Sequence, residues 1–119
     1  MRILVLGITG LLGSAVFHVL SEKKDWRVFG TLRTEESKRF FAPVLNLNLV
    51  VGVDVLDQAE LIKLFEQTNP DVVINCISLA KPLLSAGCPL DIIPIYALLP
   101  HHLAHLCSLA GARLVHIST

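Results

Sequence analysis

Three glycines stand between a short apolar run and a stretch with helical periodicity, close to the start of the chain. Residues 7–13 read Gly-Ile-Thr-Gly-Leu-Leu-Gly, so a glycine recurs at every third position. The apolar run Arg2–Leu6 before them predicts a buried strand, and Leu11–Leu20 after them predicts a helix. A strand that turns through glycines directly into a helix is typical of the phosphate-binding element of α/β folds that bind dinucleotides.

The spacing of these glycines suits the chemistry of a phosphate loop. One glycine allows a sharp turn off the strand, one lets the backbone approach a pyrophosphate, and one lets the helix pack tightly on the sheet. The helix N-terminus adds unpaired N–H groups and the positive end of its dipole. A tight turn without a ligand is the alternative. The expected cofactor-binding residues here are Gly7, Thr9, Gly10, Leu11, Leu12 and Gly13.

The alternation of apolar strands and helices continues through the whole chain. Further strands are predicted at Trp26–Leu32, Asn48–Val53, Val72–Cys76 and Leu114–Ile117, and a short charged helix or loop at Thr34–Phe41. Helices are predicted after Asp57 and over Ile92–Ala110. Strands that alternate with helices pair in parallel through right-handed crossovers. We therefore expect one α/β domain over residues 1–119, a doubly wound Rossmann fold of five parallel strands with helices on both faces.

Two local features of the helices can be tested directly. Asp57 and Glu60 have the spacing of a capping box, in which each side chain bonds the backbone N–H of the other residue. Pro100 falls inside the predicted helix Ile92–Ala110, where a proline removes a hydrogen bond and predicts a kink.

The composition narrows the class of partner. Hydrophobic residues make up 53% of the chain and charged residues 17%, which suits a sheet with both faces covered. The ten basic residues balance the ten acidic ones, so no overall field attracts nucleic acid or an anionic membrane. A small molecule is the expected partner, and a homodimer stays open. Residues 3–20 are uncharged and resemble a secretory leader or membrane span, but the strict glycine spacing and His18 argue against both.

The cysteines and histidines predict neither a disulfide framework nor a metal site. Cys76, Cys88 and Cys107 are odd in number and widely spaced, which indicates free thiols in a cytoplasmic protein. His101 and His105 share a helical face, but no carboxylate accompanies them in a zinc-binding pattern.

The end of the second predicted strand bears on the choice of cofactor. An acidic residue at this point typically binds the ribose hydroxyls of NAD, whereas this sequence reads Thr31-Leu32-Arg33. A guanidinium can pair with the 2′-phosphate that distinguishes NADP. Arg33 therefore favours NADP(H), with NAD(H) still open. A solvated Arg33 paired with Glu35 or Glu36 is the alternative.

Three segments resemble the extended short-chain dehydrogenases/reductases, and among these the dTDP-4-dehydrorhamnose reductase-like group, which acts on sugar nucleotides. They are ITGLLGSA at residues 8–15, DVVINCIS at residues 71–78 and GARLVHIST at residues 111–119. The resemblance spans essentially all 119 residues but only the cofactor half of such enzymes. It implies that this chain is the N-terminal part of a longer protein whose substrate-binding part lies elsewhere.

The resemblance also implies roles for residues after the later strands. Asp54 and the backbone of Val55 would contact adenine, although the residues alone also allow Asp54 to cap a helix. Cys76, Ile77 and Ser78 would lie against the nicotinamide ribose, where Ile77 is bulkier than usual. Thr119, or Ser118 beside it, would be the catalytic hydroxyl that works with a Tyr and a Lys spaced Y-x-x-x-K.

The sequence departs from the family pattern at two points. Tyr96 stands where relatives often carry an asparagine. Tyr96 is also the only tyrosine, and Pro100 follows four positions later, so these 119 residues contain no Y-x-x-x-K. The expected function is the NADP(H)-binding part of a reductase that transfers hydride to or from a sugar nucleotide. A dinucleotide-binding regulatory subunit without turnover is the alternative, as is a sugar-nucleotide epimerase or dehydratase.

Overall fold

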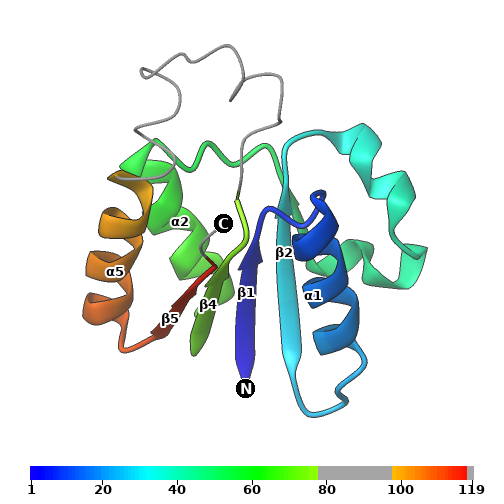
Figure 1. Cartoon of the computed structure of the whole chain (residues 1–119), viewed down its shortest axis with the longest axis horizontal. Coiled ribbons are helices and arrows are strands. Elements are labelled where there is room, and N and C mark those ends of the chain that lie inside the picture. Colours follow the sequence, from blue (N-terminus) through cyan, green and yellow to red (C-terminus); the bar gives the residue numbers. More distant parts are fainter. Residues whose placement is uncertain (78–97, 118–119) are drawn as a thin grey trace.

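Five parallel strands form the centre of the molecule. The computed structural model describes residues 1–77 and 98–117, apart from the side chain of Asn46. The sheet has the order β3-β2-β1-β4-β5 and places the strand that begins the chain in the middle (Figure 1). The strands are β1 (Arg2–Leu6), β2 (Arg27–Leu32), β3 (Leu49–Val51), β4 (Val72–Asn75) and β5 (Arg113–His116). The predicted fold class is confirmed.

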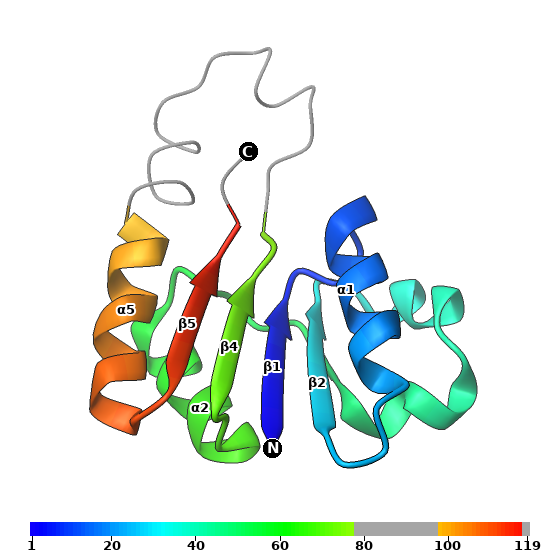
Figure 2. The ribbon, with the colours of Figure 1, turned by 60° about the horizontal axis from the view of Figure 1, so that its bottom comes forward.

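The order of the strands reverses at β1, which pairs with β2 on one side and with β4 on the other. Leu4 lies opposite Phe29 of β2 and Val73 of β4, and all four ladders of the sheet are parallel. Ligands of doubly wound sheets bind outside the carboxyl ends of the strands at this point of reversal. The glycine loop after β1 occupies that point (Figure 2).

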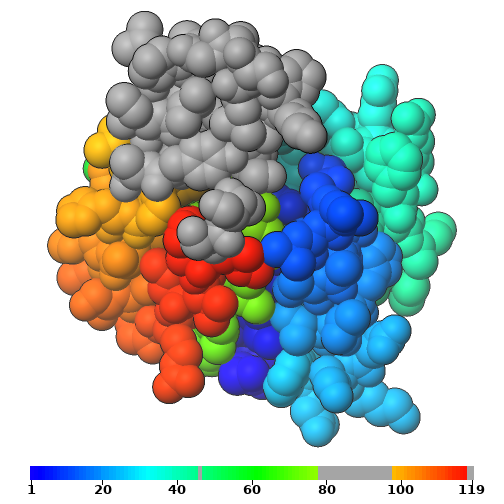
Figure 3. Space-filling view, in the orientation of Figure 1, coloured from blue at the N-terminus to red at the C-terminus, as the bar shows by residue number. Residues whose placement is uncertain are grey.

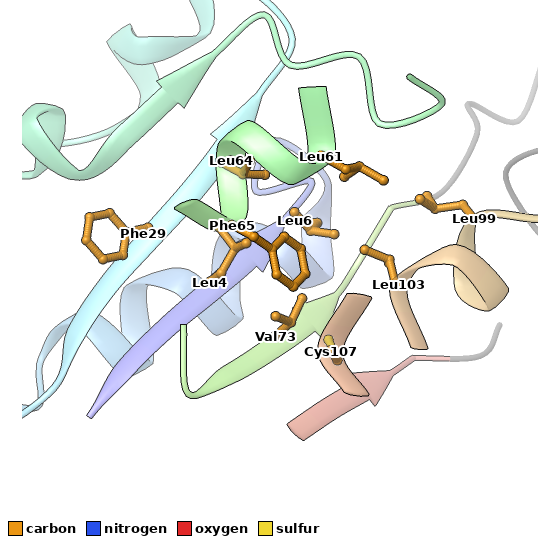
Figure 4. Close-up of a cluster of buried hydrophobic side chains, with 10 residues drawn as sticks. All are labelled: Leu4, Leu6, Phe29, Leu61, Leu64, Phe65, Val73, Leu99, Leu103 and Cys107. Carbon is orange, nitrogen blue, oxygen red and sulfur yellow. The ribbon is translucent and has the colours of Figure 1, made fainter. Parts of the chain in front are cut away.

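Helices cover the two faces of the sheet unequally. The face that carries Leu4, Leu6 and Val73 packs on α2 (Gln58–Thr68) and α5 (Leu99–Ala110) in one continuous core (Figure 4). The opposite face carries Ile3 and Val5 and packs on α1 (Leu11–Ser21) and on two short 3₁₀ helices. These are η1 (Glu35–Phe40) and η2 (Pro43–Asn48). On this second face the described residues leave β4 and β5 largely uncovered beside α1 (Figure 3), and Val115 is 41% exposed.

The structure corrects several details of the sequence prediction. The third strand is only Leu49–Val51, because a 3₁₀ helix takes the residues before it and Gly52 turns the chain with φ +76°. Only half of the predicted capping box forms. The Asp57 carboxylate accepts from the N–H groups of Ala59 and Glu60, but the Glu60 carboxylate accepts from the N–H of Asp54 and not from that of Asp57.

The kink predicted at Pro100 stays a prediction. α5 is described from Leu99, which places Pro100 in its first turn, and Leu98 before it already has helical backbone angles, φ −78° and ψ −42°. The earlier residues of the predicted helix, 92–97, lie outside the described residues. Over the ranges 1–77 and 98–117, no helix is long and apolar enough to cross a membrane, and no cluster of side chains could hold a metal ion.

Candidate dinucleotide-binding site

The carboxyl ends of four strands bring the predicted site residues to one edge of the sheet. Gly7 follows β1, Arg33 follows β2, Asp54 lies three residues after β3, and Cys76 follows β4. Because all these strands are parallel, the segments that leave them emerge on the same side. The grouping that the sequence predicts for these residues is therefore present in the fold.

The N-terminus of α1 is open to an anion. Gly10 is the N-cap residue and supplies no side-chain hydrogen bond, and the first helical bond runs from Ser14 N–H to the Gly10 carbonyl, at 2.9 Å. The N–H groups of Leu11, Leu12 and Gly13 precede the first bond of the helical ladder. Thr9, Gly10, Leu11 and Leu12 are all exposed, and the side chain of Leu11 is 95% exposed. This end of the helix therefore presents backbone N–H donors and the partial positive charge of the helix dipole to solvent.

Glycine occupies each of the three positions of the loop for a different physical reason. Gly7 has φ +76°, and a Cβ there would lie 3.0 Å from Ile77 Cγ1. A Cβ on Gly13 would lie 2.0 Å from the Gly7 carbonyl oxygen, so only glycine lets α1 start this close to β1. Gly10 has φ −72° and nothing within 4 Å of its Cβ position. Gly7 and Gly13 are therefore required by the fold, whereas Gly10 keeps space open outside it.

A residue that the sequence analysis did not single out holds the loop on β2. Thr31, only 5% exposed, accepts the Gly7 N–H on its hydroxyl oxygen at 3.0 Å. Its carbonyl oxygen accepts the N–H of Ile8, also at 3.0 Å. The signal in the sequence was a polar side chain near the end of an otherwise apolar buried strand, since such a side chain requires a hydrogen-bond partner.

Asn75, at the end of β4, is a second residue of this kind. Its side chain is 1% exposed, and its carbonyl oxygen accepts the Ile77 N–H at 3.2 Å. Because that backbone group can only donate, the other amide atom is the nitrogen, and it donates to His116 Nδ1 at 3.1 Å. The amide thus joins the carboxyl ends of β4 and β5.

Arg33 and Asp54 both face solvent at the edge of the sheet. Arg33 is exposed, and within the described residues Glu35 pairs with Lys38 at 2.9 Å rather than with Arg33. Asp54 accepts the Leu56 N–H on one carboxylate oxygen at 3.0 Å, and its neighbour Val55 packs against the core. Asp54 is not the helix cap that the residues alone allowed, since Asp57 caps α2.

The residues that follow β4 lie against the glycine loop. Cys76 is half-buried, and its Cβ lies 3.2 Å from the Cβ position of Gly13. Burial raises the pKa of the Cys76 thiol, and likewise that of Cys107. Ile77 packs against the α2–α5 core, and its Cγ1 lies 3.0 Å from the Cβ position of Gly7, so its side chain lies against the glycine loop. Ser78, Cys88, Tyr96, Ser118 and Thr119 lie outside the described residues, so the expectations for them stay untested.

A parallel sheet that reverses at β1, with a glycine loop and an open helix N-terminus at that point, defines a dinucleotide-binding domain of the Rossmann class. The family model described as the NAD dependent epimerase/dehydratase family matches residues 3–119. The chain belongs to this family, which confirms the resemblance to extended short-chain dehydrogenases/reductases.

Relatives agree with this assignment. The chain is 30% identical over 118 residues to methionine adenosyltransferase 2 subunit beta of Xenopus laevis, which covers 99% of this chain and 32% of the relative. Among solved structures it is similar to a UDP-glucose-4-epimerase of Stenotrophomonas maltophila, with a TM-score of 0.80 and 20% identity, over 100% of this chain and 37% of the other. It is also similar to a hypothetical dTDP-4-dehydrorhamnose reductase of Sulfolobus tokodaii, with a TM-score of 0.78 and 22% identity, over 99% of this chain and 39% of the reductase chain. The chain thus spans about a third of the length of these proteins.

Proposed function

We propose that this chain binds a nicotinamide dinucleotide with the pyrophosphate seated on the N-terminus of α1. The observation that carries the proposal is the state of that helix end. The N-cap residue Gly10 has no side chain to occupy the leading N–H groups, and the space above it is open. A pyrophosphate would accept hydrogen bonds from the backbone of residues 9–13 and would lie at the positive end of the helix dipole.

We propose further that the dinucleotide is NADP(H) in preference to NAD(H). Arg33 is exposed at the carboxyl end of β2, and two acidic residues of η1 could have neutralised it. Of these, Glu35 pairs with Lys38, and within the described residues Glu36 forms no ion pair. A free guanidinium at this point can form paired hydrogen bonds with the 2′-phosphate. Asp54 keeps a carboxylate oxygen available for the adenine edge, because its bond to Leu56 uses only the other oxygen.

The test of dinucleotide binding is a titration of the 119-residue chain with NADPH and NADH, followed by tryptophan fluorescence or calorimetry. Saturable binding of either cofactor supports the site, and tighter binding of NADPH supports the role of Arg33. Gly10→Val is the matched variant, since it fills the space proposed for the pyrophosphate and its Cβ meets no atom of the described residues within 4 Å. No saturable binding of either cofactor would exclude the proposal.

For the whole protein we propose a dinucleotide-binding regulatory subunit that partners a methionine adenosyltransferase. Two observations support this choice over a reductase. The relative with 30% identity is a subunit of that enzyme, and this chain has Tyr96 where reductase-like relatives often have asparagine. Co-purification of the full-length protein with a methionine adenosyltransferase catalytic subunit tests it. A full-length protein that does not associate with that enzyme would contradict it.

A reductase acting on a sugar nucleotide is the second candidate. It is supported by the fold shared with a dTDP-4-dehydrorhamnose reductase and by the hydroxyl residues Ser118 and Thr119 after β5. Oxidation of NADPH by the full-length protein in the presence of dTDP-4-dehydrorhamnose or a related keto sugar nucleotide would favour this reading. The absence of turnover, together with retained NADPH binding, would favour the regulatory subunit.

A further inference from the structure

Two consecutive N–H groups of the glycine loop point at the same neighbouring strand. Gly7 and Ile8 donate to the hydroxyl oxygen and the carbonyl oxygen of Thr31, each at 3.0 Å. In a regular strand, successive N–H groups point to opposite sides, so a neighbour would receive only every second one. Odd-numbered residues of β1 face β2 and even-numbered ones face β4, so the Gly7 N–H points to β2 by the regular pattern. The positive φ of Gly7 turns the Ile8 N–H to the same side, where it takes the Thr31 carbonyl and leaves β2 with one extra donor.

The hydroxyl of Thr31 is the acceptor for that extra donor. The β1–β2 ladder ends at the pair Val5 and Gly30, one residue before Thr31. Beyond that pair the β2 carbonyl at residue 31 is already used by Ile8. A partly buried backbone N–H without an acceptor is costly, so the Gly7 turn depends on a side-chain oxygen at this position.

We propose that Thr31 is a positioning residue of the phosphate loop, which fixes the exit of the chain from β1 and so aims the N–H groups of residues 9–13. The proposal rests on the proposed dinucleotide site. Gly7 and Ile8 are the last residues anchored to the sheet before the exposed turn of Thr9 and Gly10. Losing one of their two anchors frees the turn to rotate, which separates the donors from the geometry that a pyrophosphate requires.

Thr31→Val tests the hydroxyl alone. Valine keeps the branched shape and strand propensity of threonine but cannot accept the Gly7 N–H. Thr31→Ser keeps the acceptor and serves as the rescue variant. Thr34→Val is the matched control, because Thr34 is exposed just beyond β2 and bonds Ser37 at 2.9 Å rather than the loop. The probes are NADPH and ADP, which both carry two linked phosphates on the adenosine 5′-oxygen.

Thr31→Val is expected to weaken the binding of NADPH and ADP by up to about tenfold, because binding must then order a loop that the lost Gly7–Thr31 hydrogen bond no longer holds. Thr31→Ser and Thr34→Val are expected to bind as the unmodified chain does. Equal binding by Thr31→Val overturns the proposal, and so does an equal loss in Thr31→Ser, which would assign the effect to the methyl group.

Hydrogen exchange at single amides keeps the proposal testable even if Thr31→Val does not fold or no dinucleotide binds. In the unmodified chain the Gly7 amide should exchange as slowly as Ile8. A Gly7 amide that exchanges as fast as a solvent-exposed one overturns the tether to Thr31. If Gly7 is protected but neither NADPH nor ADP binds the unmodified chain, the tether stands as a structural bond and both the proposed dinucleotide site and its positioning role fall.

Discussion

Replacing Gly10 by valine should remove dinucleotide binding and leave the fold in place. The Cβ position of Gly10 meets no atom within 4 Å, and its backbone, with φ −72° and ψ 166°, is one that valine adopts readily. The cost to folding should therefore stay within about 1 kcal/mol. The same side chain would stand in the open space over the N–H groups of Leu11, Leu12 and Gly13, which a phosphate must reach.

The loss of affinity can be worked out from those N–H groups. A hydrogen bond to a charged group contributes about 1.5–3 kcal/mol, so displacing the phosphate from two of them costs at least about 3 kcal/mol. That free energy corresponds to a loss of affinity of about 150-fold or more. Calorimetric titration with NADPH measures it, and thermal unfolding of the same sample shows whether the variant is folded.

Gly13→Ala is the contrasting variant, because there the fold rather than the ligand requires glycine. Its Cβ would lie 2.0 Å from the Gly7 carbonyl oxygen, a contact that only a shift of α1 away from β1 could relieve. Overpacking of this kind costs about 1–3 kcal/mol or more, a large part of the roughly 5–15 kcal/mol that stabilises a typical domain.

A folded Gly10→Val variant that binds NADPH as tightly as the unmodified chain would refute the phosphate-loop assignment.

Four further outcomes are expected. Arg33→Ala should weaken the binding of NADPH by about tenfold, because one charge-assisted contact is lost, and should leave the binding of NADH unchanged in parallel titrations. Equal effects on both cofactors would exclude a role of Arg33 at the 2′-phosphate. The 119-residue chain, whose only tyrosine Tyr96 is not part of a Y-x-x-x-K, should not oxidise NADPH with keto sugar nucleotides, and measurable cofactor-dependent turnover would contradict this. The same chain should self-associate in sedimentation through the uncovered face of β4 and β5, and Val115→Lys should reduce this association; an unchanged sedimentation profile would place the contact elsewhere. Because burial raises the pKa of the Cys76 thiol, its alkylation by iodoacetamide should be slow at neutral pH and keep rising at pH values where a free cysteine has levelled off; a plateau like that of free cysteine in peptide mass spectrometry would show a fully exposed thiol.

The fold was predictable because its signals are local and repeated. Each strand is a short apolar run bounded by a turn, and both the β1–glycine–α1 junction and the Asp57 cap are contained within a few residues. The third strand was overestimated because the valines continue past Gly52 to Val53, and an apolar run does not show where strand pairing stops. The partner of Glu60 was missed because Asp54 reaches it only after the chain turns at Gly52.

Burial within the helices does not follow from the sequence alone, because the spacing of apolar residues does not say which stripe of a helix faces the sheet. Leu12 and Val19 share the helical periodicity of α1, yet they are 46% and 58% exposed, while Gly13 and Phe17 are buried. The glycine fixes the orientation of α1, since it is the only residue that can approach the Gly7 carbonyl. Thr31 was missed for a similar reason: its role depends on which N–H groups a non-local turn presents to it.

Two of the helices that begin at the carboxyl edge, α1 and α2, show why we propose the site at α1 and not at α2. α2 is closed by its own side chain, because the Asp57 carboxylate accepts from Ala59 and Glu60 and brings a negative charge that would repel a phosphate. α1 begins at a glycine that supplies no side-chain cap, although a serine, threonine or aspartate there would stabilise the helix by roughly a few tenths of a kcal/mol relative to glycine. The space around Gly10 would admit such a side chain. The N-terminus of α1, which lies where the order of the strands reverses, is thus left without a side-chain cap. A bound pyrophosphate would supply the negative charge and the hydrogen-bond acceptors that this helix end lacks.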